Sequence, residues 1–264
     1  MTTIEQHLET SKNSVSTKLN QMVDQLYTNH GLAMFKAGSE WENMNLDEII
    51  YLHKLGTYDI PLLMKVSGVE ARTEMRQLLQ AGVDMFLAPM VESEYALEKF
   101  ITIAQEVGQE QQKTPKTAIM IESIQTYHNL ESIINSPYFA EVEKVVLGRW
   151  DLANSMGTTN VDSPEVKTVC QKIVNAVQTK NKSISVGGFV NPRTAPSVKK
   201  ELGANMLNTI NFLLDIDKCG DISQAVELML QAEIAYYTVL QQINPRRAKF
   251  YQSRIDITNK KLYS

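Results

Sequence analysis

Two carboxylates in the middle of the chain follow short apolar runs. Glu122 comes directly after residues 119–121, and Asp151 lies three residues after the run 145–148. Apolar runs of this length, bounded by polar residues and separated by a helical stretch, are typical of buried parallel strands. The C-terminal ends of such strands meet at one edge, so we expect both side chains to share a site. Two otherwise uncompensated carboxylates suit a hard divalent cation. The alternative is helix capping, because Asp and Glu are favoured near helix N-termini.

The elements that must position these carboxylates alternate regularly along the chain. Short apolar runs predict seven strands, and amphipathic stretches between them predict helices. Asn45, with Glu48 three residues later, resembles a capping box at one helix start. Repeated strand and helix without a break in composition favours a single α/β domain over residues 1–264, either a doubly wound sheet or a (β/α) barrel. The predicted strands are 31–36, 61–66, 85–91, 117–121, 145–148, 184–189 and 204–210.

The strand count favours a (β/α)8 TIM barrel in which one strand is not evident. Either the leading segment hides the eighth strand or the barrel is modified. Helical periodicity predicts an extra helix at 15–28 before the first strand, and two further helices at 222–240 and 245–260 after the last one. Residues 1–12 are polar, and we expect them to be flexible.

Composition and charge place the chain among ordinary globular proteins. Apolar residues make up 43% and charged residues 21% of the sequence, enough for a full-sized core. The formal net charge of −4 gives no general attraction to nucleic acid or acidic membranes, so a small-molecule partner is expected. No targeting signal or membrane-length apolar segment is evident, which predicts a cytoplasmic protein without a membrane partner. Cys170 and Cys219 stand far apart and lack a zinc-like spacing.

Three motifs flank the ends of predicted strands. They are APMVES at 88–93, IMIES at 119–123 and LGRWDLANSMG at 147–157. Their order and spacing resemble the HpcH/HpaI aldolase and citrate lyase family over about residues 32–210, and a citrate-lyase-β-like subgroup most. The resemblance implies a (β/α)8 barrel of the phosphoenolpyruvate/pyruvate type. It also implies that one Glu and one Asp bind Mg²⁺ or a similar ion such as Mn²⁺, and by position these match Glu122 and Asp151.

The implied ion has a defined chemistry. Mg²⁺ keeps several waters, which leaves room for a 2-oxo acid to chelate through its carboxylate and carbonyl oxygens. As a Lewis acid it would stabilise the enolate formed when the adjacent carbon–carbon bond breaks or forms. Most of the family carries an Arg at the end of the second strand, and the matching Lys65 keeps the charge but loses the bidentate fork. Lys36, on the first strand, is also expected to point into the barrel mouth. For both lysines the alternative is a solvated strand end.

The first strand leads into a segment that departs from the family pattern. Aldolases of the family carry Asp-Gly-Glu-His there, and residues 38–41 place Trp41 in the position of the acid–base His. Trp cannot shuttle a proton, so Trp41 is a candidate for substrate binding only. Glu40 is retained, either as a base or holder of metal-bound water, or as a hydrogen-bonding support. A subgroup of citrate-lyase-like barrels shares Lys-x-x-x-Glu, which matches Lys36 and Glu40. The absence of the His therefore does not by itself imply an inactive enzyme.

Three further features have two interpretations each. Arg149 binds an anionic substrate group or forms a salt bridge with a neighbouring loop. Glu92 follows a strand and is a substrate-binding candidate with the same ambiguity. Residues 244–264 form a basic helical arm, and a run of charges is usually a solvated face. Because C-terminal helices of the family often pack against a neighbouring subunit, the arm is expected to serve as a homo-oligomer contact or a lid.

Together these features favour a divalent-metal-dependent carbon–carbon lyase or aldolase that acts on a 2-oxo acid or related carboxylate. Glu122 and Asp151 would hold the metal, and Lys65, Glu40 and Lys36 would serve the chemistry. The absent His motivates an alternative, a catalytically lapsed barrel that binds a metabolite or acts as an accessory protein. A weaker alternative is acyl-CoA lyase chemistry as in citrate lyase, for which the sequence shows no identifiable adenine or pantetheine pocket.

Overall fold

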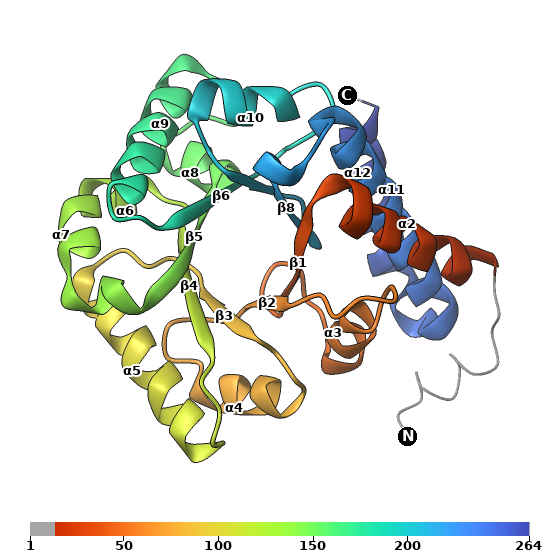
Figure 1. The fold of residues 1–264 in the computed structure, drawn as a ribbon, viewed down its shortest axis with the longest axis horizontal. Coiled ribbons are helices and arrows are strands. Elements are labelled where there is room, and N and C mark those ends of the chain that lie inside the picture. The colour runs from red at the N-terminus through yellow and green to blue at the C-terminus, as the bar shows by residue number, and fades with distance from the viewer. Residues whose placement is uncertain (1–13, 264) are drawn as a thin grey trace.

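A computed structural model describes residues 14–263 as a closed barrel of eight strands surrounded by helices (Figure 1). The first seven strands follow one another in chain order and pair in parallel. Each connection between them contains at least one helix. The strands are β1 (Leu32–Gly38), β2 (Leu62–Lys65), β3 (Met85–Ala88), β4 (Lys116–Ile121), β5 (Val142–Gly148), β6 (Ser183–Gly187), β7 (Met206–Asn208) and β8 (Phe212–Asp215).

The eighth strand, β8, runs antiparallel to both of its neighbours and closes the barrel. It pairs with β7 on one side, where Leu207 lies opposite Leu214, and with β1 on the other. Residues 209–211 form the whole connection from β7, because an antiparallel pair needs no crossover helix. The strand predicted over 204–210 is confirmed as β7, but the prediction that it is the last strand was wrong. The connecting turn contains neither Gly nor Pro, so the single Asn211 is a weak signal for the start of β8. The barrel is modified, and the leading segment is a helix.

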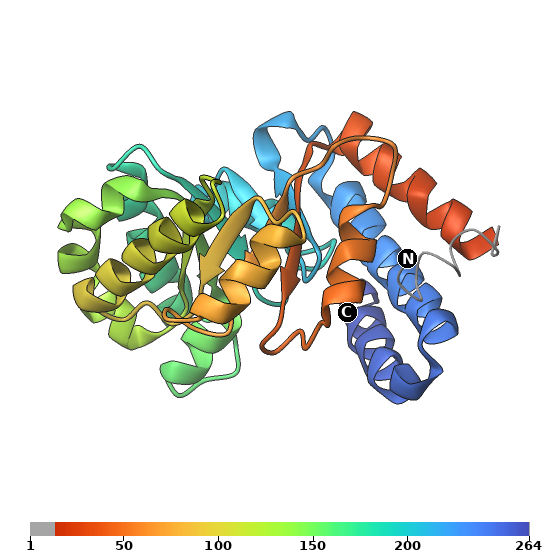
Figure 2. The ribbon, with the colours of Figure 1, turned by 90° about the horizontal axis from the view of Figure 1, so that it is seen from below.

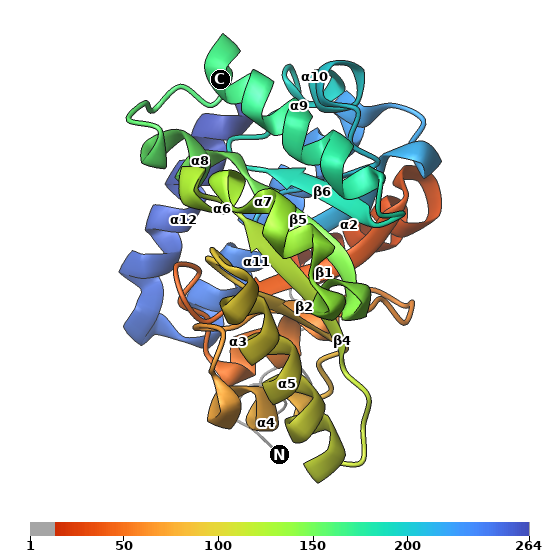
Figure 3. The same ribbon diagram turned by 90° about the vertical axis from the view of Figure 1, so that its left-hand side faces the viewer.

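Helices cover the outer face of the barrel. They are α2 (Ser14–His30), α3 (Leu46–His53), α4 (Arg72–Gln80), α5 (Glu94–Glu110), α6 (Ile124–His128), α7 (Leu130–Asn135), α8 (Arg149–Ser155), α9 (Pro164–Gln178), α10 (Ala195–Leu202), α11 (Ile222–Ile243) and α12 (Ala248–Leu262), with short 3-10 turns η1 (Pro137–Glu141), η2 (Ile216–Lys218) and η3 (Pro245–Arg247). α2, α11 and α12 gather on one side (Figure 2), and α5, α7 and α9 lie over another (Figure 3). Within residues 14–263, every helix is too short or too polar to cross a bilayer.

The C-terminal arm is anchored to the barrel through Glu48 of α3. The predicted capping box is confirmed, since Asn45 Oδ1 accepts a hydrogen bond of 3.0 Å from the Glu48 N–H and Glu48 Oε2 accepts one of 3.2 Å from the Asn45 N–H. The same buried carboxylate accepts a hydrogen bond from the Tyr251 hydroxyl and lies 3.0 Å from Arg247 Nη1. The arm is therefore a structural part of this chain. The leading helix predicted at 15–28 is confirmed as α2, and the predicted flexibility of residues 1–12 lies outside the described residues.

The barrel interior is filled by apolar side chains beneath a charged layer. Along a strand every second side chain points to the same face, so the residue two positions after an inner apolar residue also faces inward. This periodicity brings Lys36, Lys65 and Glu122 to the C-terminal end of the interior. The inner apolar residues are Met34, Leu63, Met85, Leu87, Ala118, Met120, Val146, Met206 and Leu213.

Candidate active site

A cavity of about 510 Å³ opens at the C-terminal ends of the strands. Most of the residues that the sequence suggested line it, but Arg149 and Glu92 do not. One side of the cavity is built by Ile257 and Lys261 of the C-terminal helix α12. The suggested residues that the fold brings together here are Lys36, Glu40, Trp41, Lys65, Glu122 and Asp151.

Glu122 lies at the end of β4 with its side chain fully buried. Its Oε1 accepts a hydrogen bond of 3.0 Å from the backbone N–H of Met90, a residue in the left-handed conformation with φ of 49°. Its Oε2 lies 3.9 Å from Lys65 Nζ and has no hydrogen-bond partner within the described part of the chain. Gly148 on β5 makes room for this arrangement, because a Cβ there would lie 2.9 Å from Glu122 Cβ. One carboxylate oxygen is thus fixed, buried and available to a ligand.

Helix capping does not account for Glu122 and accounts only partly for Asp151. Ser123 is the N-cap of α6, and its Oγ accepts a hydrogen bond of 3.1 Å from the Thr126 N–H. Asp151 lies in the first turn of α8, whose N-cap is Gly148, so its charge is favourably placed in the helix dipole. Within residues 14–263, however, the half-buried Asp151 side chain makes no hydrogen bond or ion pair. Both carboxylates therefore remain able to bind a ligand.

The pKa values of both carboxyl groups are raised, mainly by burial. At Glu122 the charge of Asp151 adds to the effect of burial, whereas the ammonium of Lys65 opposes it. At Asp151 burial is again the largest cause, Lys65 opposes it, and neighbouring glutamates add to it. Glu122 and Asp151 therefore lie within electrostatic range of each other, and two like charges in such a site favour the binding of a cation between them.

These donors fit a hard divalent ion. Mg²⁺ prefers oxygen ligands and is commonly bound through one or two carboxylates with several waters retained. The Oε2 of Glu122, which accepts no hydrogen bond, and the unpaired carboxylate of Asp151 can coordinate without breaking a hydrogen bond among the described residues. Residues 14–263 contain no group of three or more His, Cys, Asp or Glu side chains arranged to hold a metal. An ion bound by these two residues would complete its coordination with water or substrate.

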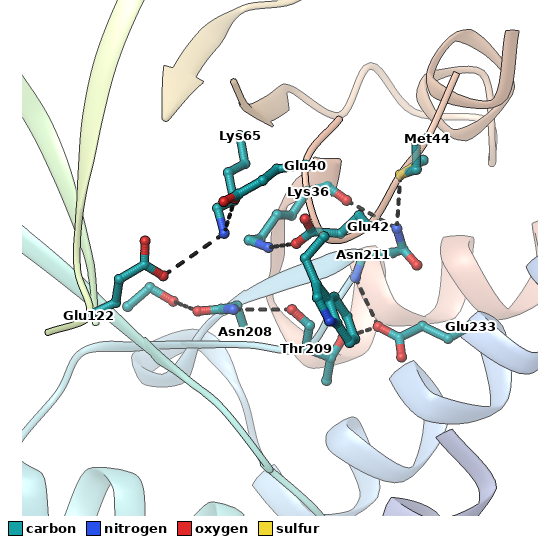
Figure 4. Close-up of polar contacts among 12 residues, drawn as sticks. Lys36, Glu40, Glu42, Met44, Lys65, Glu122, Asn208, Thr209, Asn211 and Glu233 are labelled. Atoms are coloured by element: carbon teal, nitrogen blue, oxygen red, sulfur yellow. Dashed lines mark hydrogen bonds and ion pairs between the residues drawn. The ribbon is translucent and has the colours of Figure 1, made fainter. Parts of the chain in front are cut away.

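Lys65, at the end of β2, stands among several carboxylates. Its Nζ lies 2.7 Å from Glu40 Oε2, on the opposite side from Glu122 (Figure 4). Burial alone would lower the pKa of Lys65, but Glu122, Glu42 and Glu40 together outweigh burial and hold the pKa above its usual value. The side chain is therefore an ammonium ion at neutral pH, suited to stabilising negative charge. Glu40 exposes 40% of its side chain, so solvent or a substrate can contact its carboxylate.

Sequence reasoning missed Glu42, which forms a second lysine–glutamate pair in the cavity. Lys36 Nζ lies 2.9 Å from Glu42 Oε1, and both side chains are buried (Figure 4). Burial raises the pKa of Glu42, but Lys36 and Lys65 outweigh burial and lower the pKa to about 2. A Cβ at Gly38 would collide with the Glu42 carboxylate. This glycine at a strand end was the available sequence signal, since such a glycine often marks a close approach.

Three more polar residues line the cavity without a distinctive sequence signal, namely Asn208, Thr209 and Lys261. Asn208 of β7 accepts a hydrogen bond of 2.8 Å from Ser185 Oγ and donates one of 3.1 Å to the Thr209 carbonyl, so its orientation is fixed (Figure 4). Lys261 belongs to the C-terminal arm. Burial lowers the pKa of Lys261, and the buried Glu233 opposes this effect. The arm thus contributes an amine side chain to the cavity wall of its own chain.

A sequence profile described as HpcH/HpaI aldolase/citrate lyase matches residues 47–194, more than half of the chain. The chain belongs to this family. The matched region includes Lys65, Glu122 and Asp151. Lys36, Glu40, Trp41, Glu42 and Lys261 lie outside it, so the two ends of the chain supply the part of the cavity that the profile does not cover.

Solved structures show the same family fold. A HpcH/HpaI aldolase/citrate lyase family protein from Burkholderia cenocepacia J2315 aligns with a TM-score of 0.59 and 14% identity over 82% of this chain and 88% of that one. A citrate lyase from Burkholderia xenovorans LB400 aligns with a TM-score of 0.53 and 12% identity over 90% and 95%. The citrate synthase SbnG aligns with a TM-score of 0.53 and 13% identity over 72% and 90%. A comparison with curated protein sequences found no match.

In this member of the family, Arg149 lies behind the cavity wall. Its Nη1 is 3.0 Å from Asp162 Oδ1, and its Nε and Nη2 donate hydrogen bonds of 3.2 and 2.8 Å to the carbonyl groups of Gly187 and Gly188. The geometry favours the salt-bridge alternative, in which Arg149 positions the loop after β6. Glu92 accepts a hydrogen bond of 2.5 Å from Ser123 Oγ, which directs its carboxylate to the start of α6.

Proposed function

We propose that the chain is a divalent-metal-dependent carbon–carbon lyase or aldolase acting on a 2-oxo acid or a related carboxylate, with Mg²⁺ or Mn²⁺ as its ion. The family comprises enzymes of the aldolase and citrate lyase type, and its members generally use a divalent metal. One observation carries the proposal, the buried and unpartnered Oε2 of Glu122 beside the Lys65 ammonium. With Asp151 nearby, it offers an ion a fixed ligand next to a positive charge.

The residues of this chain have distinct proposed roles. A bound divalent ion, held by Glu122 and Asp151, would supply Lewis acidity toward the substrate carbonyl group. In the cleavage direction, Glu40 takes the hydroxyl proton of the substrate and the carbon–carbon bond breaks to release an aldehyde. The electron pair moves into an enolate, whose negative charge Lys65 stabilises. Glu40 then returns the proton to the enolate carbon. Lys36 adds positive potential for the substrate carboxylate.

Calorimetric titration of the full chain with Mg²⁺ and Mn²⁺ tests the proposal. Glu122→Gln keeps the side-chain shape but removes the charge, and we expect it to weaken metal binding by more than about tenfold and to abolish turnover of 4-hydroxy-2-oxo acids. Glu131→Gln is the matched control, because Glu131 is exposed on α7. A native protein that binds neither ion, together with unchanged behaviour of Glu122→Gln, would refute the proposal.

A second candidate is a catalytically lapsed barrel that binds a metabolite or serves as an accessory protein. Trp41 lies in the cavity, and no His of residues 14–263 lines it. Binding of a 2-oxo acid without turnover, and a gain of activity in Trp41→His, would support this candidate. Robust native turnover would remove it.

Three sequence predictions stay predictions. Acyl-CoA chemistry of the citrate lyase type is the weaker alternative, and product profiling with oxaloacetate, 4-hydroxy-2-oxo acids and malyl-CoA-like thioesters would separate it from aldol cleavage. Homo-oligomer formation through the C-terminal helices can be measured by light scattering of the full chain. A cytoplasmic location can be measured by cell fractionation.

A further inference from the structure

Large apolar side chains surround the mouth of the cavity and remain exposed to solvent. Nine large apolar residues are exposed among residues 14–263, and four of them line this one cavity. We call these four residues the apolar rim. They include both tryptophans of the chain. Isolated exposed apolar residues need no explanation, but a cluster around one cavity marks a binding surface. The members are Trp41, Met90, Trp150 and Phe189.

The apolar rim is continuous with the proposed metal ligands. Trp150 directly precedes Asp151 in α8, and the backbone N–H of Met90 holds Glu122. A substrate that binds an ion held by Glu122 and Asp151 would therefore have the apolar rim beside its remaining part.

Two members of the rim are held in an unfavourable backbone conformation. Met90 and Phe189 have φ values of 49° and 52°, in the left-handed region that bulky residues avoid. At Met90 this conformation allows the hydrogen bond to Glu122. Strain of this kind persists where surrounding contacts impose it, and it gathers at functional sites.

Contacts around Phe189 fix the ring in place. Its centroid lies 4.6 Å from that of Trp150 at an interplanar angle of 40°. The preceding Gly188 packs against the start of α8, because a Cβ added at Gly188 would lie 2.7 Å from the backbone nitrogen of Trp150. Lys261 Nζ of α12 lies 5.7 Å from the Phe189 ring. These contacts hold the ring beside Trp150 at the wall of the cavity.

Trp41, another member of the rim, is fixed by the same helix. The Arg254 guanidinium of α12 lies 3.8 Å from the centroid of the Trp41 ring and donates a hydrogen bond to the Trp41 carbonyl oxygen. Preorganised aromatic surfaces bind flat apolar groups at low entropic cost. The polar groups of the cavity, in contrast, are already paired or assigned to the ion and the 2-oxo acid.

From these contacts we propose that the apolar rim recognises an uncharged aromatic group on the substrate, carried by the carbon that becomes the released aldehyde. This inference rests on the proposed function. It assigns the substrate class as 4-aryl-4-hydroxy-2-oxo acids, and it gives Phe189 and Trp150 the role of specificity-determining residues.

Binding of two unreactive 2-oxo acids tests the proposal. The probes are 2-oxo-4-phenylbutanoate and 2-oxobutanoate, which share the metal-binding end and lack the hydroxyl needed for cleavage. Calorimetry with the Mg²⁺-loaded full chain should show that the phenyl compound binds about tenfold more tightly. Binding of the phenyl compound should also quench the tryptophan fluorescence of the protein, because both tryptophans lie at the cavity mouth.

Variants separate the rim from general apolar binding. Phe189→Ala should remove most of the preference for the phenyl compound while leaving the affinity for 2-oxobutanoate within about twofold of native. Phe189→Leu, which keeps apolar contact but loses the flat face, should retain part of it. Tyr95→Ala is the matched control, because Tyr95 is exposed but does not line the cavity.

The remaining outcomes distinguish a failure of this inference from a failure of the proposed function. Equal affinities of the two probes, or a phenyl preference that survives in Phe189→Ala, would refute this inference alone. Binding of neither probe would refute the proposed function and this inference together. Self-association that Phe189→Ala abolishes, without a preference for the phenyl compound, would assign the rim to a second copy of the chain and overturn the proposal.

Discussion

Replacing Glu42 by Gln should destabilise the fold by about 3 kcal/mol at neutral pH, because the substitution leaves Lys36 buried without its counter-ion. Lys36 and Glu42 expose only 4% and 5% of their surfaces, so water cannot replace the lost partner effectively. The pair was not evident from the sequence, which makes it a direct test of the tertiary structure.

The expected loss of stability in Glu42→Gln follows from the pKa of Glu42. Folding lowers this pKa from 4.5 to about 2, which corresponds to about 3 kcal/mol of stabilisation at pH 7. Since the folded pKa lies below the unfolded one, the stabilisation is present above about pH 4.5 and is lost as the pH falls through about 2. At about pH 3 roughly 1 kcal/mol remains. The destabilisation by Glu42→Gln should therefore shrink as the solution is acidified.

Urea unfolding followed by circular dichroism, at neutral pH and near pH 3, measures both effects. Glu131→Gln removes an exposed carboxylate and should change the free energy of unfolding by less than about 0.5 kcal/mol. The double variant Lys36→Met with Glu42→Leu should recover much of the loss, because replacing both ions avoids a lone buried charge. A change below about 0.5 kcal/mol in the free energy of unfolding of Glu42→Gln, or a destabilisation independent of pH, would show that Glu42 does not compensate the buried charge of Lys36.

Two further predictions concern the proposed metal site. Gly148→Ala should weaken Mg²⁺ binding by about tenfold, because its Cβ would lie 2.9 Å from Glu122 Cβ and displace that side chain. Gly68→Ala is the control, since no atom lies within 4 Å of the added Cβ. Equal Mg²⁺ affinities of the two variants in calorimetry would contradict the expected role of Gly148. Mg²⁺ affinity should also fall on acidification at a higher pH than for an ordinary carboxylate site, since burial raises the pKa of Glu122 and Asp151 and only their ionised forms bind the ion. Calorimetric titrations between about pH 5 and 8 measure this dependence, and a constant affinity over that range would count against these ligands.

Local sequence patterns were sufficient for the parts of this fold that depend on periodicity. Apolar runs located seven strands, and the alternation of side chains along them brings Lys36, Lys65 and Glu122 to the barrel mouth. The capping box at Asn45 was evident for the same reason, because its partners lie three residues apart. The strand β8 was missed because its hairpin uses no Gly or Pro.

Local patterns along the chain therefore specify the order of elements, the family, and which charged residues stand at strand ends. Tertiary structure decided the partners of those residues. Glu42 lies in a loop, where no period constrains direction, and only the missing side chain of Gly38 lets it reach Lys36. Arg149 pairs with Asp162, and Lys261 enters the cavity from the end of the chain, because contacts between distant segments depend on how loops and helices pack. Packing, which no local pattern encodes, therefore set the electrostatics and the apolar rim of this cavity.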